Sequence, residues 1–162
     1  MIPWERLDAV MLEDGVELRL MRRGTEFSIM LGSNELMNSR LSGSEEALAN
    51  LAADKLQGRP GLRMLIGGLG MGFTLRAALK ALGADARITV AELVPQVVAW
   101  AKGPMSPVFG DCLDDPRVAL AEADVGELIR NARNEWDAIV LDVDNGPDGL
   151  TRQGNDALYS AA

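Results

Sequence analysis

The amino-acid sequence predicts an α/β fold in which a small antiparallel β unit precedes a doubly wound parallel sheet. Two observations lead to this prediction. From residue 62 onward, short apolar runs alternate with helix-like segments, and a glycine-dense turn follows the first of these runs. Residues 16–31, by contrast, show the pattern of a hairpin. Strand–helix–strand repeats produce parallel sheets with helices on their faces, whereas hairpins produce antiparallel sheets.

Residues 1–41 are expected to form a small unit of β-hairpins. Residues 16–21 alternate between apolar and mostly charged side chains, which is typical of a half-buried strand. Residues 26–31 form a second strand-like run, and Arg23-Gly24-Thr25 between the two runs has the composition of a hairpin turn. The two runs are therefore expected to pair antiparallel.

Residues 42–162 are expected to form the domain that contains the parallel sheet. A first helix begins near Ser42 or Ser44, because acidic residues follow these candidate caps and apolar residues then recur at helical spacing. The Gly-Arg-Pro-Gly segment at residues 58–61 ends this helix. Further strands are expected over residues 62–67, 87–92, 117–121 and 136–142, and further helices over residues 71–82, 95–101 and 125–132.

The C-terminal end of the predicted domain is short. Residues 102–116 are rich in Gly, Pro and Asp and are expected to form a loop. A last helix is expected over residues 156–162, with no strand after it. An open sheet of four strands is small for this architecture, so two alternatives stay open: a small four-stranded sheet, or a domain that is truncated at its C-terminus and has further strands outside the given sequence.

Composition disfavours several classes of function. The chain has 162 residues, of which 48% are hydrophobic, enough for one domain with a substantial core. A formal net charge of −8 disfavours a nucleic-acid-binding surface, which needs a basic footprint. Because no histidine is present, Ser–His and Cys–His catalysis are excluded and no metal site is expected. The single cysteine, Cys112, fits a reducing cytoplasm, and no apolar run is long enough to span a membrane.

The turn after residue 67 has the features of a nucleotide-binding loop. Gly68, Gly70 and Gly72 allow a sharp turn and the close approach of a ligand, and the helix that follows offers unpaired N–H groups. Glycines alone are a weak signal, but Glu92 stands at the end of the next predicted strand, about twenty residues after the loop. A carboxylate at this position accepts hydrogen bonds from both hydroxyls of a ribose.

Two further strand ends carry acidic residues. Asp124 follows the third predicted strand and Asp142 ends the fourth, so both belong to the carboxyl edge, where open α/β sheets bind ligands. Each also has a structural interpretation, Asp124 as a helix cap and Asp142 as a turn former. A nicotinamide-dependent oxidoreductase is a weaker alternative, because Phe73 stands where the third glycine of that fingerprint is needed.

Residues 64–147 resemble the S-adenosylmethionine-binding core of class I methyltransferases, in particular of the spermidine synthase-like branch. The motifs that carry the resemblance are residues 66–72 (IGGLGMG), 91–95 (AELVP), 115–118 (DPRV), 122–125 (EADV) and 136–142 (WDAIVLD). The hairpins before the first helix also resemble the small β domain of aminopropyltransferases. The resemblance implies a Rossmann-like domain that binds S-adenosylmethionine or its decarboxylated form.

The resemblance also implies roles for individual residues. Gly68, Gly70 and Gly72 would lie against the amino-acid part and the ribose of the cofactor, with Leu69 in the same loop. Glu92 would hold the ribose hydroxyls. The remaining implied contacts are those of Leu93 beside the adenine, Asp124 with the adenine amino group, Val125 next to the ring, and Asp142 near the sulfonium.

Asp142 and Asp144 are the candidate catalytic residues. Asp142 would orient or deprotonate the nucleophile, and Asp144 would supply a second negative charge near a cationic acceptor. Two aminopropyltransferase features are absent, because Glu45-Glu46-Ala47 replaces a Tyr-His-Glu stretch and Asn145 replaces the second acid of an Asp-x-x-Asp pair. We therefore expect methyl transfer to a small acceptor, with polyamine aminopropyl transfer and a non-catalytic binding or dimerisation module as alternatives.

The expected partners are a small-molecule acceptor, with an amine as one candidate, and a second copy of the chain. Members of the family often dimerise, and the exposed edge of the hairpin unit suits pairing between copies. No nucleic-acid or membrane partner is expected, and the predicted location is the cytoplasm.

Overall fold

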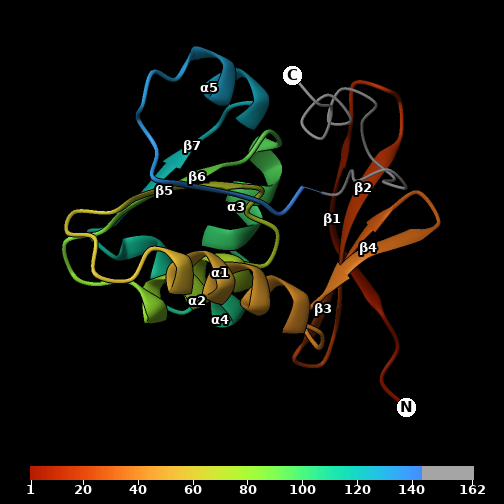
Figure 1. Cartoon of the computed structure of the whole chain (residues 1–162). Coiled ribbons are helices and arrows are strands. Elements are labelled where there is room, and N and C mark those ends of the chain that lie inside the picture. Colours follow the sequence, from red (N-terminus) through yellow and green to blue (C-terminus); the bar gives the residue numbers. More distant parts are fainter. Residues whose placement is uncertain (144–162) are drawn as a thin grey trace.

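The computed structural model describes residues 1–143, which form two four-stranded sheets (Figure 1). The N-terminal sheet is antiparallel with the order β1-β2-β3-β4, and the second sheet is parallel with the order β7-β6-β5-β8. The predicted α/β fold is thereby confirmed. The helix expected over residues 156–162 lies outside the described residues.

The small antiparallel sheet contains two strands that were predicted and two that were not. β2 (Glu17–Arg23) and β3 (Glu26–Leu31) pair antiparallel, as the hairpin pattern indicated. β1 (Glu5–Met11) and β4 (Asn34–Asn38) extend the sheet on either side of this hairpin. The apolar positions of β2 are buried while the charged positions between them remain partly exposed, so one face of the sheet is covered.

The parallel sheet uses the four apolar runs of the second half of the chain. β5 (Arg63–Gly67) lies between β6 (Arg87–Ala91) and β8 (Ala138–Leu141), and β7 (Val118–Ala121) pairs with the other side of β6. Each strand lies inside its predicted range. β5 is buried along nearly its whole length, as expected for a central parallel strand that is covered on both faces.

Helices cover both faces of the parallel sheet (Figure 1). α1 (Gly43–Lys55) and α2 (Phe73–Ala81) pack against each other on one face, and α5 (Val125–Asn131) lies on the other. Within residues 1–143, no helix combines the length and the apolar character that crossing a bilayer requires.

The connection between β6 and β7 is more helical than the sequence indicated. α3 (Pro95–Lys102) begins with a proline at the first helical position, as expected. The segment predicted as a loop over residues 102–116 contains α4 (Ser106–Phe109) and the 3-10 helix η1 (Cys112–Asp114). Elements of one turn are too short to produce an apolar periodicity, so the sequence pattern does not reveal them.

The two sheets share one hydrophobic core. Leu20 of the small sheet belongs to the same buried cluster as Ile66 of β5 and Trp100 of α3. In addition, Asp8 of β1 accepts a hydrogen bond from Nε1 of Trp100 at 2.8 Å and another from the side-chain amide of Gln96. The small sheet is therefore held against α3 by apolar packing and by partly buried side-chain hydrogen bonds together.

Candidate functional site

β5 ends in the predicted glycine loop, at the carboxyl edge of the parallel sheet. Gly68, Gly70 and Gly72 have φ values of +94°, +51° and +77°, a region where other residues are strained. A Cβ atom at Gly68 would also overlap the carbonyl oxygen of Asp142. Because α2 begins directly after the loop, backbone N–H groups and the positive end of the helix dipole lie at the same edge of the sheet.

Glu92 follows β6 and is held by two backbone donors. The N–H of Leu69 donates to Oε2 at 3.0 Å, and the N–H of Val94 donates to Oε1 at 3.0 Å. Burial raises the pKa of the Glu92 carboxyl above its ordinary value, although the backbone hydrogen bonds oppose this shift. The side chain is still partly exposed, and each carboxylate oxygen has capacity for a second hydrogen bond.

Asp124 and Asp142 are oriented by hydrogen bonds at the same edge. Asp124 caps α5, because its Oδ1 accepts a hydrogen bond from the N–H of Gly126 at 2.7 Å. Asp142 follows β8, and its Oδ2 accepts a hydrogen bond from the hydroxyl of Thr74, a buried residue of α2, at 2.9 Å. The capping interpretation of Asp124 is therefore confirmed, and it leaves Asp124 in the wall of a cavity.

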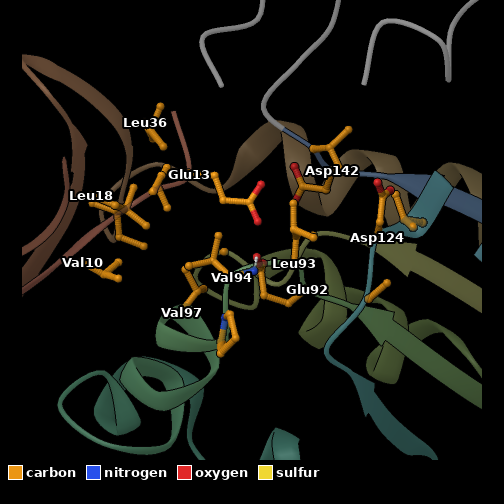
Figure 2. Close-up of a pocket in the computed structure, with 18 of the residues that line it drawn as sticks. Val10, Glu13, Leu18, Leu36, Glu92, Leu93, Val94, Val97, Asp124 and Asp142 are labelled. Carbon is orange, nitrogen blue, oxygen red and sulfur yellow. Dashed lines mark hydrogen bonds between the residues drawn. The ribbon is translucent and has the colours of Figure 1, made fainter. Parts of the chain in front are cut away.

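A cavity of ≈ 480 Å³ lies between this edge and the small sheet (Figure 2). Volumes of this size are typical of small-molecule sites. The residues of the predicted cofactor site that line it are Gly68, Gly70, Glu92, Leu93, Asp124, Val125 and Asp142. Leu69 and Gly72 do not line it, because Leu69 is buried beside Glu92 and Gly72 lies against the ring of Phe109. Asp144 lies outside the described residues.

The opposite wall of the cavity comes from the small sheet, which sequence reasoning did not connect with the site. Its apolar members are Val10, Leu18, Ile29, Leu36 and Met37. The connection between β1 and β2 adds the carboxylates of Glu13 and Asp14. The Asp14-Gly15 pair is a turn signal that could have located this hairpin, but it carries no information about what the hairpin faces.

The cavity is acidic. Five carboxylates line it, those of Glu13, Asp14, Glu92, Asp124 and Asp142, and none of its lining residues within the described part of the chain is Lys or Arg. The surrounding potential therefore favours a ligand that carries positive charge and disfavours one that carries a carboxylate or a phosphate.

The sequence is similar to part of one curated protein. No family model matches the sequence. Over 85 residues, 51% of this chain, the sequence is 34% identical to Polyamine aminopropyltransferase 1 of Streptomyces coelicolor, and the match covers 16% of that protein. The chain thus corresponds to a small part of this curated relative.

Solved structures of spermidine synthases are similar to most of the chain. The spermidine synthase from Thermotoga maritima matches with a TM-score of 0.69 at 20% identity, over 86% of this chain and 48% of that one. A spermidine synthase in complex with the transition-state analogue AdoDATO matches with a TM-score of 0.70 at 20% identity, over 89% and 48%. A probable spermidine synthase from Corynebacterium glutamicum matches with a TM-score of 0.61 at 15% identity, over 93% and 55%. The chain therefore spans about half the length of these structures.

The comparisons contradict the predicted preference for methyl transfer. The curated relative is an aminopropyltransferase, and the similar structures named above are spermidine synthases. The glycine loop and Glu92 are the implied contacts of the adenosyl part, which both kinds of donor share, so these residues do not identify the group that is transferred. The described chain has a spermidine synthase-like fold, a parallel sheet preceded by a small antiparallel sheet.

Proposed function

We propose that this chain forms the adenosyl-binding part of a polyamine aminopropyltransferase. The reaction would move an aminopropyl group from decarboxylated S-adenosylmethionine to an amine such as putrescine. The observation that carries the proposal is the negative charge of the cavity. Among the described residues, five carboxylates line it, and no Lys or Arg does. A cationic donor without a carboxylate fits these surroundings, whereas the carboxylate of S-adenosylmethionine itself would meet like charges.

Each residue of the carboxyl edge has a role in this proposal. Glu92 accepts hydrogen bonds from the ribose hydroxyls, because each of its carboxylate oxygens can accept one more hydrogen bond besides that from its backbone donor. Leu93, an exposed apolar side chain of the cavity wall, packs beside the adenine, and Val125 lies next to the ring. Asp124 accepts from the adenine amino group while it caps α5. Gly68 and Gly70 allow the donor to approach the backbone.

The proposed chemistry is an in-line displacement at the carbon next to the sulfonium. A bond forms between the amine nitrogen and this carbon as the carbon–sulfur bond breaks, and the sulfur keeps the electron pair and leaves as neutral methylthioadenosine. The attacking amine loses one proton, for which Asp142 is the proposed acceptor, because Thr74 holds its carboxylate in the cavity wall. Asp144, outside the described residues, is the second candidate. The protein contributes mainly by aligning the donor with the acceptor.

Titration calorimetry tests the donor site. We expect the chain to bind methylthioadenosine and decarboxylated S-adenosylmethionine, and to bind S-adenosylmethionine more weakly. Glu92→Ala should weaken binding by about 10- to 100-fold, because it removes charge-assisted hydrogen bonds. Glu122→Ala is the matched control, since Glu122 follows β7 at the same edge but is exposed and does not line the cavity.

A product assay tests the reaction. Incubation with decarboxylated S-adenosylmethionine and putrescine should release methylthioadenosine, and S-adenosylmethionine should not replace the donor. Tighter binding of S-adenosylmethionine than of its decarboxylated form, or no binding of either, would contradict the proposal. The homodimer and the cytoplasmic location stay predictions.

A further inference from the structure

Asp8 is a charged residue on the inner, apolar face of the small sheet. It lies opposite Leu20, which is fully buried, and cross-strand partners point to the same face. This orientation depends on an irregularity of β1, whose register on β2 shifts between Arg6 and Asp8. In a regular ladder Leu7 would lie opposite Leu20, and Asp8 would lie opposite Arg19 on the outer face. A register shift of this kind re-aims a side chain, and here it turns the carboxylate inward.

The inward carboxylate joins β1 to α3. Its Oδ2 accepts hydrogen bonds from Nε1 of Trp100 at 2.8 Å and from the side-chain amide of Gln96, and its Oδ1 accepts one from the N–H of Ala9 at 2.9 Å. Gln96 and Trp100 are four residues apart and therefore lie on one face of α3. Trp100 is 1% exposed, and Asp8 satisfies its indole N–H. The hydrogen bond from Trp100 is the main reason why the pKa of Asp8 lies below its ordinary value, so the carboxylate stays charged from mildly acidic pH upward.

This bridge stands directly behind two residues of the cavity wall. Val10 follows Asp8 by two positions on the same face of β1, and Val97 is next to Gln96 in α3. Figure 2 shows Val10 projecting from the small sheet and Val97 from α3. α3 itself begins shortly after Glu92 of the proposed donor site. Asp8 therefore connects the two walls of the cavity without lining it.

We propose that Asp8 is a positioning residue, which holds the small sheet where it completes the cavity around the donor. The inference rests on the proposed function, because it concerns a wall of the same cavity. Apolar packing is not directional, whereas two side-chain donors on one carboxylate fix a geometry. Without the bridge the small sheet would take a range of positions, of which only a part completes the site. The apparent affinity for the donor would then fall with the fraction of competent molecules.

A distance measurement tests the position of the small sheet without any ligand. Nitroxide labels are attached through Ser33→Cys, in the connection between β3 and β4, and Lys80→Cys of α2, both exposed positions outside the cavity. Cys112→Ala removes the one native thiol. Pulsed electron paramagnetic resonance should give a narrow distance distribution with Asp8 in place and a broader one in Asp8→Ala. An unchanged distribution in Asp8→Ala would overturn the proposal.

Calorimetry measures the consequence for the site. Asp8→Ala should bind methylthioadenosine about three- to tenfold more weakly than the wild type, and Asp8→Asn, whose amide oxygen still accepts from Trp100, should lose less. Asp54→Ala is the matched control, because Asp54 is an exposed residue of α1 that does not line the cavity. Ile88→Val removes one buried methylene group from β6 outside the cavity. It should lower the resistance to denaturant and leave the methylthioadenosine affinity unchanged.

The outcomes separate this inference from the proposed function. If the wild type and Asp8→Ala bind methylthioadenosine equally well, the positioning role is overturned and the donor site stands. Equal weakening in Ile88→Val and Asp8→Ala would also overturn it, because stability alone would then govern binding. A wild type that does not bind methylthioadenosine contradicts the proposed function, and the distance distributions then decide alone whether Asp8 holds the small sheet in place.

Discussion

At the scale of single residues, the protonation of Glu92 governs the proposed donor site. Burial raises the pKa of the Glu92 carboxyl above the ordinary value of 4.5, so this carboxyl loses its proton at a higher pH than the carboxyl of an exposed glutamate does. Ribose hydroxyls donate hydrogen bonds, which the ionised carboxylate accepts and the protonated form accepts less well. We therefore expect the affinity for methylthioadenosine to increase as the pH rises through the raised pKa, and to fall below it.

Calorimetric titrations over a series of pH values measure this dependence. Glu92→Gln should bind methylthioadenosine weakly and without the pH-dependent step, because glutamine does not titrate. Glu122→Gln should keep the wild-type profile, since Glu122 does not line the cavity. A step that persists in Glu92→Gln would show that another group controls binding.

At the scale of elements, the loop between β5 and α2 is fixed by its contact with the end of β8. Gly68 combines a φ of +94° with a position where a Cβ atom would overlap the backbone oxygen of Asp142. Gly58 has a similar φ of +81°, but a Cβ atom there would meet nothing within 4 Å. Gly68→Ala should therefore lower the free energy of unfolding by about 1–3 kcal/mol more than Gly58→Ala, the usual cost of overpacking.

Denaturant unfolding of the two variants gives this difference directly. Because both substitutions impose a side chain on a left-handed backbone, the comparison cancels that shared strain and isolates the steric overlap. Equal destabilisation of the two variants would mean that β8 moves away from the loop at little cost.

Some helices and strands of this fold can be predicted from the sequence and others cannot. The strands of the parallel sheet carry continuous apolar runs, and the β2–β3 hairpin alternates around a glycine turn, so both are readable locally. β1 and β4 were missed, because their sequences mix apolar and polar side chains without a regular alternation. They form strands because they pair with β2 and β3. The short helices between residues 106 and 114 were missed for lack of length.

At the scale of the whole molecule, the shared core couples the two sheets. Leu20 of β2 is fully buried in the same cluster as residues of the parallel sheet and its helices. Leu20→Ala should therefore lower the free energy of unfolding by about 2–5 kcal/mol, as for other large-to-small core substitutions. The loss should be common to both sheets, with one cooperative transition.

Thermal or denaturant unfolding that is followed by both tryptophan fluorescence and far-UV circular dichroism checks this coupling. Trp100 of α3, at the junction of the two sheets, contributes to the fluorescence together with Trp4 and Trp136, while circular dichroism reports on all helices and strands. Leu51→Ala is the control, because this leucine of α1 is 62% exposed. Separate transitions for the two signals would show that the sheets unfold independently.

The sequence alone determined the carboxyl edge of the site. Gly68, Glu92, Asp124 and Asp142 each lie at the end of a predicted strand or shortly after it. Because the carboxyl ends of parallel strands meet at one edge, local signals were sufficient to bring them together. Only the tertiary structure decided what faces that edge. Glu13 and Leu18 enter the cavity because the small sheet packs on α3 through a shared core, and no local pattern encodes a contact between segments so distant in the chain.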